Sequence, residues 1–152
     1  MLHIAAIFFS KQVIEAAVSA KVPNAILVHT TGRYSKFKSA SEEYIEIEEG
    51  VLQKRDKINI TVLRPTMIYG THRDRNMTKL VMFLKKHKFF PIFGQGNNLM
   101  QPVHAKDLGD AYVDVLNNWD VTSNKEYNLS GMEPIKYIDL IKAVGEHLGK
   151  KN

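Results

Sequence analysis

Tyr34 and Lys38 have a spacing that could support proton transfer. A tyrosine phenol ordinarily has a pKa of about 10, so at neutral pH it needs help to act as a base. A lysine one helical turn further along supplies a positive charge that favours the phenolate. Thr30 and Thr31 come just before, and a hydroxyl there could hydrogen-bond a reacting oxygen. The alternative is a partly buried tyrosine at the start of a helix and a solvated lysine.

Three apolar runs, 1–6, 25–29 and 58–63, would have to position these residues. Their continuous apolar character is typical of strands that are covered on both faces. Between them, residues 13–18 and 37–51 repeat apolar side chains at helical spacing, and the second segment carries glutamates on its other side. Strands that alternate with helices form right-handed βαβ units, so we predict an α/β fold with a parallel sheet.

After residue 70 the pattern changes to shorter elements. Ser10 and Asp107 are predicted to be helix N-caps, because short polar side chains can accept bonds from free backbone N–H groups. We expect residues 1–70 to form the sheet and residues 71–152 to form a small C-terminal α/β cap, packed as one domain with it. The expected later elements are a helix over 77–84, a helix after Asp107, a strand over 127–129 and a helix over 138–148 that Gly149 ends.

The composition excludes several classes of function. The 152 residues include 44% hydrophobic and 24% charged residues, which is ordinary for a globular domain. Without cysteine there are no disulfides, thiolate metal ligands or cysteine nucleophiles. The net charge of +5 is scattered, and the first apolar run is too short to span a membrane. We therefore expect a cytoplasmic protein with a small-molecule substrate, and no metal, nucleic-acid or membrane partner.

Several short motifs follow one another in an order that is typical of one family. They are HIAA at 3–6, ILVHTTG at 26–32, RPTMIYG at 64–70, PVHAKDL at 102–108 and NLSG at 128–131. In these motifs the chain resembles the NAD-dependent epimerase/dehydratase family of extended and atypical short-chain dehydrogenases. The resemblance covers essentially the whole chain, and it implies part of a Rossmann-type, doubly wound parallel sheet.

The resemblance also implies roles for individual residues. Tyr34 would be the acid–base residue, Lys38 would tune it, and Thr30 or Thr31 would orient the substrate. This chain departs from the family in the short interval between the threonines and Tyr34. The charged loop with His72, Arg73 and Arg75 could bind an anionic substrate group, although it could also be simply solvated. NAD or NADP would contact His3, Ala5, Ala6, Pro65, Thr66, Met67 and Ile68.

The family's glycine-rich phosphate loop, which follows its first strand, has no counterpart here. Gly94 and Gly96 cannot replace this loop, because they neither follow a predicted strand nor precede a predicted helix. We therefore expect the chain to be incomplete, without roughly the first three strands of a Rossmann sheet. Residues 1–6 would then form an exposed, apolar edge. We expect such an edge to associate with another copy, to need the missing segment, or to leave the chain poorly soluble.

The sequence lacks a positive charge at a position that bears on the choice of substrate. Nucleotide-sugar enzymes of this family often carry an arginine where Met100 and Gln101 stand, to hold a diphosphate. An uncharged carbonyl or alcohol, which could be sugar-derived, is therefore favoured as substrate. Two alternatives to an NAD(P)-dependent oxidoreductase or epimerase remain open. One is a non-catalytic module that senses a dinucleotide or binds a partner, and the other is an inactive fragment.

Overall fold

The computed structural model describes residues 1–74, 76–87, 90–92 and 94–149. The chain divides into two compact units, the first formed by 1–66 and 110–129 and the second by 67–109 and 130–152. This division differs from the expected boundary at residue 70. The reason is that β7 (Glu126–Leu129), which was expected in the cap, hydrogen-bonds to β3 (Asn59–Pro65) and so belongs to the main sheet.

The first unit contains a parallel sheet of four strands in the order β1-β2-β3-β7. Strand β2 (Asn24–Val28) pairs in register with β3, and β1 (Leu2–His3) pairs with β2. The predicted parallel α/β fold is confirmed. Strand β1 is shorter than the expected run 1–6, because the chain turns at Ala6 into the 3-10 helix η1 (Ile7–Phe9). In the described part of the chain, β1 lies at one edge of the sheet.

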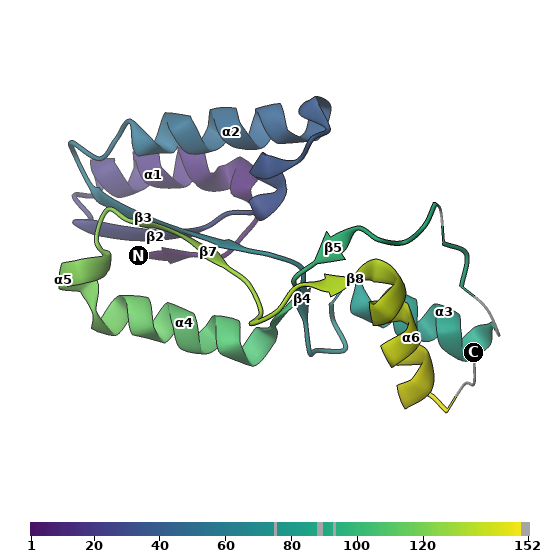
Figure 1. Cartoon of the computed structure of the whole chain (residues 1–152). Helices are drawn as coiled ribbons and strands as arrows, with labels where there is room; N and C mark the ends of the chain where they lie inside the picture. The colour runs from purple at the N-terminus through teal and green to yellow at the C-terminus, as the bar shows by residue number, and fades with distance from the viewer. Residues whose placement is uncertain (75, 88–89, 93, 150–152) are drawn as a thin grey trace. The chain divides into compact units, whose positions relative to one another are not determined.

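Helices cover both faces of this sheet (Figure 1). Ala25 and Leu27 of β2 pack with Ile14 and other side chains in one core cluster. The intervening Ile26 points to the opposite face and packs near Val115. This alternation explains why the strands are apolar throughout, and it gives the predicted doubly wound arrangement. The helices of the first face are α1 (Ser10–Ser19) and α2 (Lys38–Leu52), and those of the second are α4 (Ala105–Asn117) and α5 (Trp119–Thr122).

Some local predictions on these helices are wrong. Ser10 is the first residue of α1 rather than its cap, because its buried hydroxyl bonds the ring of His29 instead. Asp107 lies inside the first turn of α4, which begins two residues earlier at Ala105. Phe37 was expected on the buried stripe of α2 but precedes the helix and is 79% exposed.

In its described residues, the second unit contains short strand pairs, two complete helices and the first turn of α4. Its core consists of leucine and isoleucine side chains from the two helices, Leu80 and Leu84 from the first, Leu140 and Ile141 from the second. Gly149, with φ of +70°, follows the second helix and ends it as predicted. The elements are β4 (Ile68–Tyr69) parallel to β6 (Val103–His104), β5 (Leu99–Met100) antiparallel to β8 (Ile135–Lys136), α3 (Met77–Lys86) and α6 (Tyr137–His147).

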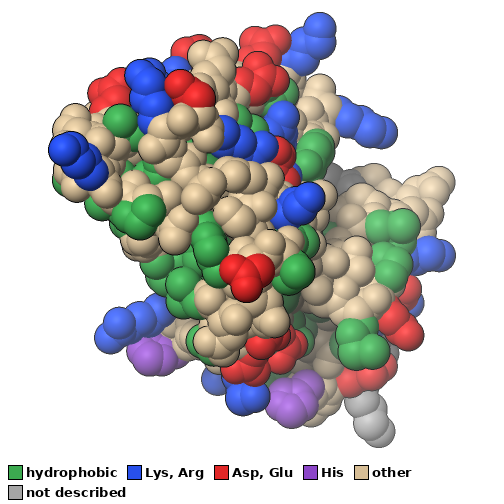
Figure 2. Space-filling model, turned by 90° about the vertical axis from the view of Figure 1, so that its left-hand side faces the viewer, with side chains coloured by type: hydrophobic (Ala, Val, Ile, Leu, Met, Phe, Trp, Pro, Cys, Tyr) green, Lys and Arg blue, Asp and Glu red, His purple; other side chains and the backbone are tan. Residues whose placement is uncertain are grey.

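The surface carries charges of both signs. On the face shown in Figure 2, basic and acidic side chains are interspersed with exposed hydrophobic ones, so the positive net charge does not form a single basic field on this side. None of the helices in the described part of the chain is long and apolar enough to cross a bilayer.

Candidate functional site

Polar side chains gather at the carboxyl ends of the parallel strands in the first unit. Thr30, Thr31 and Tyr34 follow β2, the last two in the 3-10 helix η2 (Thr31–Tyr34). The Tyr34 hydroxyl donates to Oδ1 of Asn128 on β7 at 3.4 Å. Thr31 donates to the carbonyl of Pro65, at the end of β3, at 3.3 Å. Residues from three strand ends therefore meet at the edge of the sheet where ligands of open α/β sheets bind.

Lys38 does not stand one helical turn from Tyr34, as the spacing predicted. Helix η2 ends at Tyr34, and α2 begins only at Lys38. Between them the backbone is extended at Ser35 (φ −61°, ψ 139°) and at Phe37 (φ −85°, ψ 97°). The Ser35 hydroxyl accepts a bond from the Phe37 N–H at 3.2 Å, which satisfies the chain in this open form. The pair therefore lacks the expected helical geometry, and its catalytic role stays a prediction.

Two arginines supply the positive charge that the structure places near Tyr34. The guanidinium carbon of Arg33 lies 5.6 Å from the centre of the Tyr34 ring, and that of Arg64 lies 6.0 Å from it. At such distances a cation is attracted to the negative face of an aromatic ring. Because the Tyr34 side chain is held by these contacts while the residue is 56% exposed, its hydroxyl is both ordered and accessible.

Both arginines belong to a charge cluster around the buried Glu48, which we call the Glu48 cluster: Glu48, Arg33, Arg64, His29 and Glu126. Glu48 is fully buried on α2, and Nε of Arg64 donates to its two carboxylate oxygens at 3.0 and 2.9 Å. Arg33 also pairs with Glu48, and Arg64 pairs with Glu126 on β7. The cluster thus ties α2, β3 and β7 to the turn that carries Tyr34.

His29 completes the cluster as a neutral side chain. Burial, followed by the charges of Arg64 and Arg33, lowers the pKa of His29 to about 4. The Glu48 carboxylate, 2.8 Å from Nδ1, does not reverse this direction because the arginines already neutralise it. A carboxylate only accepts, so Nδ1 carries the proton and Nε2 accepts from the Ser10 hydroxyl at 3.0 Å. His29, which directly follows β2, is therefore a hydrogen-bonded histidine at a strand end.

Sequence reasoning missed Glu48. The apolar spacing predicts a solvated side of the helix with Glu42, Glu43, Glu46 and Glu49, and it assigns no role to Glu48. Its position contains a signal, since it follows Tyr44 by four residues and precedes Val51 by three. It therefore falls in the apolar stripe of the helix, where a carboxylate requires partners.

The predicted cofactor residues divide between the two units. Pro65 and Thr66 lie at the end of β3 in the first unit, and the Thr66 N–H donates to the carbonyl of Leu129. Met67 and Ile68 belong to the second unit. Ala5 and Ala6 are exposed beyond β1.

His3 is the predicted cofactor residue with an unfilled bonding atom. It is buried on β1, and among the described residues its Nε2 has no hydrogen-bond partner. Burial lowers the pKa of His3, so its ring is neutral at neutral pH. A hydroxyl group of a dinucleotide would fit such an atom, because a hydroxyl can donate or accept a hydrogen bond.

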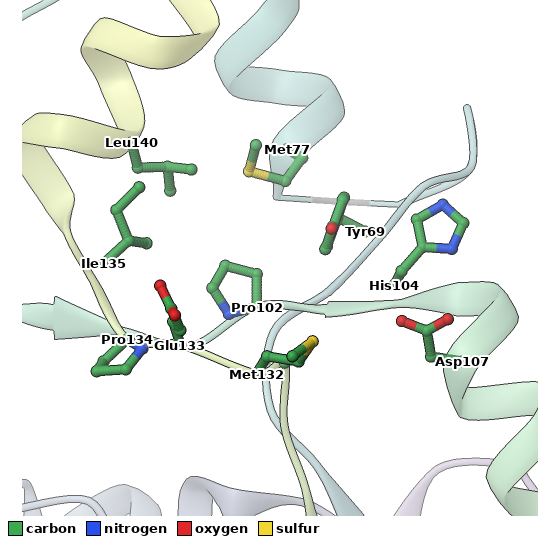
Figure 3. A pocket seen from close by; sticks show the side chains of 11 residues that line it. Tyr69, Met77, Pro102, His104, Asp107, Met132, Glu133, Pro134, Ile135 and Leu140 are labelled. Atoms are coloured by element: carbon green, nitrogen blue, oxygen red, sulfur yellow. The ribbon is translucent and has the colours of Figure 1, made fainter.

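The second unit has its own pocket, with a volume of about 550 Å³ (Figure 3). His72 and Arg73 lie in an exposed turn and are not among its lining residues, so their substrate role stays a prediction. Arg75 lies outside the described residues. The pocket is lined by Tyr69, Met77, Pro102, His104, Asp107, Gly131, Met132, Glu133, Pro134, Ile135 and Leu140.

Two of the motif glycines hold the walls of this pocket. Gly70 has φ of +102°, and a Cβ there would stand 2.2 Å from Nε2 of His104. A Cβ on Gly131 would stand 2.2 Å from the backbone oxygen of Pro102. The Gln101 side chain donates to the Gly131 carbonyl at 2.7 Å, which fixes the same approach from the other chain segment. Any side chain at either glycine would therefore force the lining apart.

A doubly wound parallel sheet with polar groups at its carboxyl edge is the architecture of Rossmann-type α/β proteins. The comparison with protein families then identifies the chain. Residues 6–152 match the 3-beta hydroxysteroid dehydrogenase/isomerase family, and the chain belongs to this family. The resemblance to extended short-chain dehydrogenases is confirmed.

Curated relatives agree with the family. Short-chain dehydrogenase/reductase family 42E member 1 of Bos taurus is 26% identical over 125 residues, which are 78% of this chain and 32% of the relative. The mitochondrial NADH dehydrogenase [ubiquinone] 1 alpha subcomplex subunit 9 of Arabidopsis thaliana is 36% identical over 84 residues, 55% of this chain and 20% of the relative. The chain thus spans a third or less of the length of these relatives.

Solved structures support the fold. The dTDP-glucose 4,6-dehydratase DesIV from Streptomyces venezuelae, solved with NAD and TYD bound, matches with a TM-score of 0.81 and 17% identity. That match covers 99% of this chain and 57% of DesIV. The UDP-glucuronic acid 4-epimerase from Bacillus cereus, solved with NAD, has a TM-score of 0.83 and 19% identity, covering 95% of this chain and 52% of the epimerase.

Proposed function

We propose that the protein is an NAD(P)-dependent oxidoreductase or epimerase-like enzyme that acts on a carbonyl or alcohol by hydride transfer. The observation that carries the proposal is the meeting of Thr30, Thr31, Tyr34 and Asn128 at the carboxyl ends of neighbouring parallel strands. Family membership and solved relatives with bound NAD support it. NAD or NADP, when bound, would supply the hydride chemistry, and His3 is the residue we expect to hold part of it.

The residues at the strand ends have different roles in proton transfer. Tyr34 moves the proton at its hydroxyl, and Asn128 orients that hydroxyl by accepting its hydrogen bond. The Thr30 hydroxyl accepts from the Gly32 N–H at 3.0 Å, so it can still donate to a substrate oxygen. The Thr31 hydroxyl already donates to Pro65. Thr30 is therefore the better candidate to hold the reacting oxygen.

The test compares Tyr34→Phe with Tyr44→Phe in the natural protein. NAD(P)H formation or consumption is followed with a panel of alcohols and carbonyls. Loss of the Tyr34 hydroxyl removes the proton donor, and we expect turnover to fall by roughly a hundredfold or more. Tyr44 is on α2 with its ring against Gly32, and the phenylalanine variant keeps that ring, so it should keep most of the activity. A near-normal rate for Tyr34→Phe would exclude Tyr34 from the mechanism.

A second candidate is a non-catalytic member that binds a dinucleotide or a partner. It is favoured by the extended backbone between Tyr34 and Lys38, which removes the helical geometry expected of a catalytic pair. A relative that is named as a subunit of NADH dehydrogenase also points this way. Saturable NAD(H) or NADP(H) binding by the natural protein, without turnover of any member of the panel, would favour this candidate.

A further inference from the structure

We propose that the pocket of the second unit binds an apolar molecule that carries a protonated amine. The proposal names a substrate class for the proposed function and rests on that function only where turnover is concerned. Its volume of about 550 Å³ lies within the range of small-molecule sites. Most of the wall is apolar, and these side chains are Met77, Pro102, Met132, Pro134, Ile135 and Leu140.

The charged side chains of the wall are all acidic. Asp107 and Glu133 line the pocket, and no lysine or arginine is among its described lining residues. In the view of Figure 3 the two carboxylates lie on opposite sides of Pro102 and Met132. A ligand in the pocket therefore meets a carboxylate on either side of Pro102. A phosphate or carboxylate would be repelled there, whereas an ammonium group would be attracted.

The remaining polar residues suit the same ligand. The rings of Tyr69 and His104 meet edge to face with their centres 5.2 Å apart, and they form one aromatic wall. Aromatic faces attract ammonium groups. Nδ1 of His104 accepts the N–H of Lys106 at 3.2 Å, so this nitrogen is not a donor to an anion. The pocket thus offers acceptors and aromatic faces to a cation.

The overall charge of the protein makes this inference discriminating. With a net charge of +5, the protein as a whole attracts anions and repels cations. A preference for an amine can therefore not come from the general field, and it must come from groups near the ligand. The inference also differs from the anionic nucleotide sugar that is bound in the structure of the similar UDP-glucuronic acid 4-epimerase.

The experiment uses rigid probes that share one apolar cage: adamantan-1-amine, adamantan-1-ol and adamantane-1-carboxylate. Binding to the chain is followed by NMR of methionine methyl groups, since Met77 and Met132 line the pocket and exposed Met82 does not. We expect the amine to bind roughly tenfold or more tighter than the carboxylate, with the alcohol between them. The shifts should be largest at Met77 and Met132.

Variants separate the pocket charges from other causes. Asp107→Asn combined with Glu133→Gln should reduce the preference of amine over carboxylate to less than about threefold. Asp139→Asn, an exposed carboxylate on α6 outside the lining, should leave it unchanged. Equal or tighter binding of the carboxylate, or an undiminished preference in the double variant, would overturn the proposal. Amine binding without NAD(P)-dependent turnover of any alcohol or carbonyl in the panel, amino alcohols included, would retain this proposal and defeat the proposed function.

Discussion

Replacing Glu48 by glutamine should strongly destabilise the first unit. The side chain is fully buried, and it is the shared partner of Arg33, Arg64 and His29. Glutamine keeps the shape but removes the negative charge. Arg64, whose side chain is 4% exposed, then keeps only Glu126 as an acidic partner among the contacts described above. Breaking a buried ion pair from one side costs about 3–5 kcal/mol, because an uncompensated charge stays in a poorly solvated place.

This loss is large compared with the stability of a domain, which is about 5–15 kcal/mol in total. Urea unfolding is the assay, with circular dichroism for the whole chain. Trp119, the single tryptophan, packs against the Ile26 and Leu63 cluster, so its fluorescence reports on the first unit. With a denaturant slope of about 2 kcal/mol per M, the fluorescence midpoint should fall by about 2 M.

Glu46→Gln is the matched control for this prediction. Glu46 is on the same helix and pairs with Lys11 at 3.0 Å, but its side chain is 78% exposed. Exposed ion pairs contribute about 1 kcal/mol or less, so the control should unfold almost like the parent. If Glu48→Gln loses less than about 1 kcal/mol, or no more than Glu46→Gln, the buried cluster does not hold the unit together and the reasoning is refuted.

Two further predictions concern His29 in the first unit and Gly131 in the second. The pKa of His29 is lowered to about 4, below the ordinary value of 6.5. Its neutral form therefore stabilises the fold fully above pH 6.5, and this contribution is lost as the pH falls from 6.5 towards 4. The ring signal of His29 in NMR, assigned with His29→Gln, should show no titration between pH 8 and about 5.5, and a midpoint near 6.5 would contradict its burial among cations. Gly131→Ala would place a methyl group 2.2 Å from the Pro102 oxygen. We therefore expect the free energy of unfolding to fall by about 1–3 kcal/mol and the probes to bind more weakly to the second unit. The control is Gly109→Ala, whose methyl group meets nothing within 4 Å and should change probe binding little. Unchanged thermal unfolding and binding in Gly131→Ala would show that the loop simply moves aside.

Local periodicity predicted most elements of the first unit, because strands covered on both faces are apolar along their length. It could not predict that β7 joins the sheet, since the four residues of β7 alternate in burial and their partner β3 is far away in sequence. The same limit explains why residues 110–129 belong to the first compact unit, although the sequence pattern changes at residue 70. Pairing between distant strands depends on tertiary packing, which short-range spacing does not encode.

The candidate site was predicted in part. Thr30, Thr31 and Tyr34 were correctly placed at a strand end, because a strand that stops at a polar pair is visible in the sequence. The relation of Tyr34 to Lys38 was wrong, since spacing of four residues implies one turn only if the backbone between them is helical. The arginines near Tyr34 were missed because they are drawn there by Glu48, a residue on a different element.

The connection between the neighbouring strands β3 and β7 contains residues 67–109 of the second unit as well as the rest of α4 and the whole of α5. Closing a loop becomes only slowly more costly as it lengthens, by about 0.6 kcal/mol for each doubling. Insertions or deletions in this connection would therefore change the pocket while the sheet, with its hydroxyl groups at the strand ends, keeps nearly the same stability. Such an architecture lets the ligand diversify independently of the scaffold, and it makes this connection the natural place to exchange segments between homologous chains.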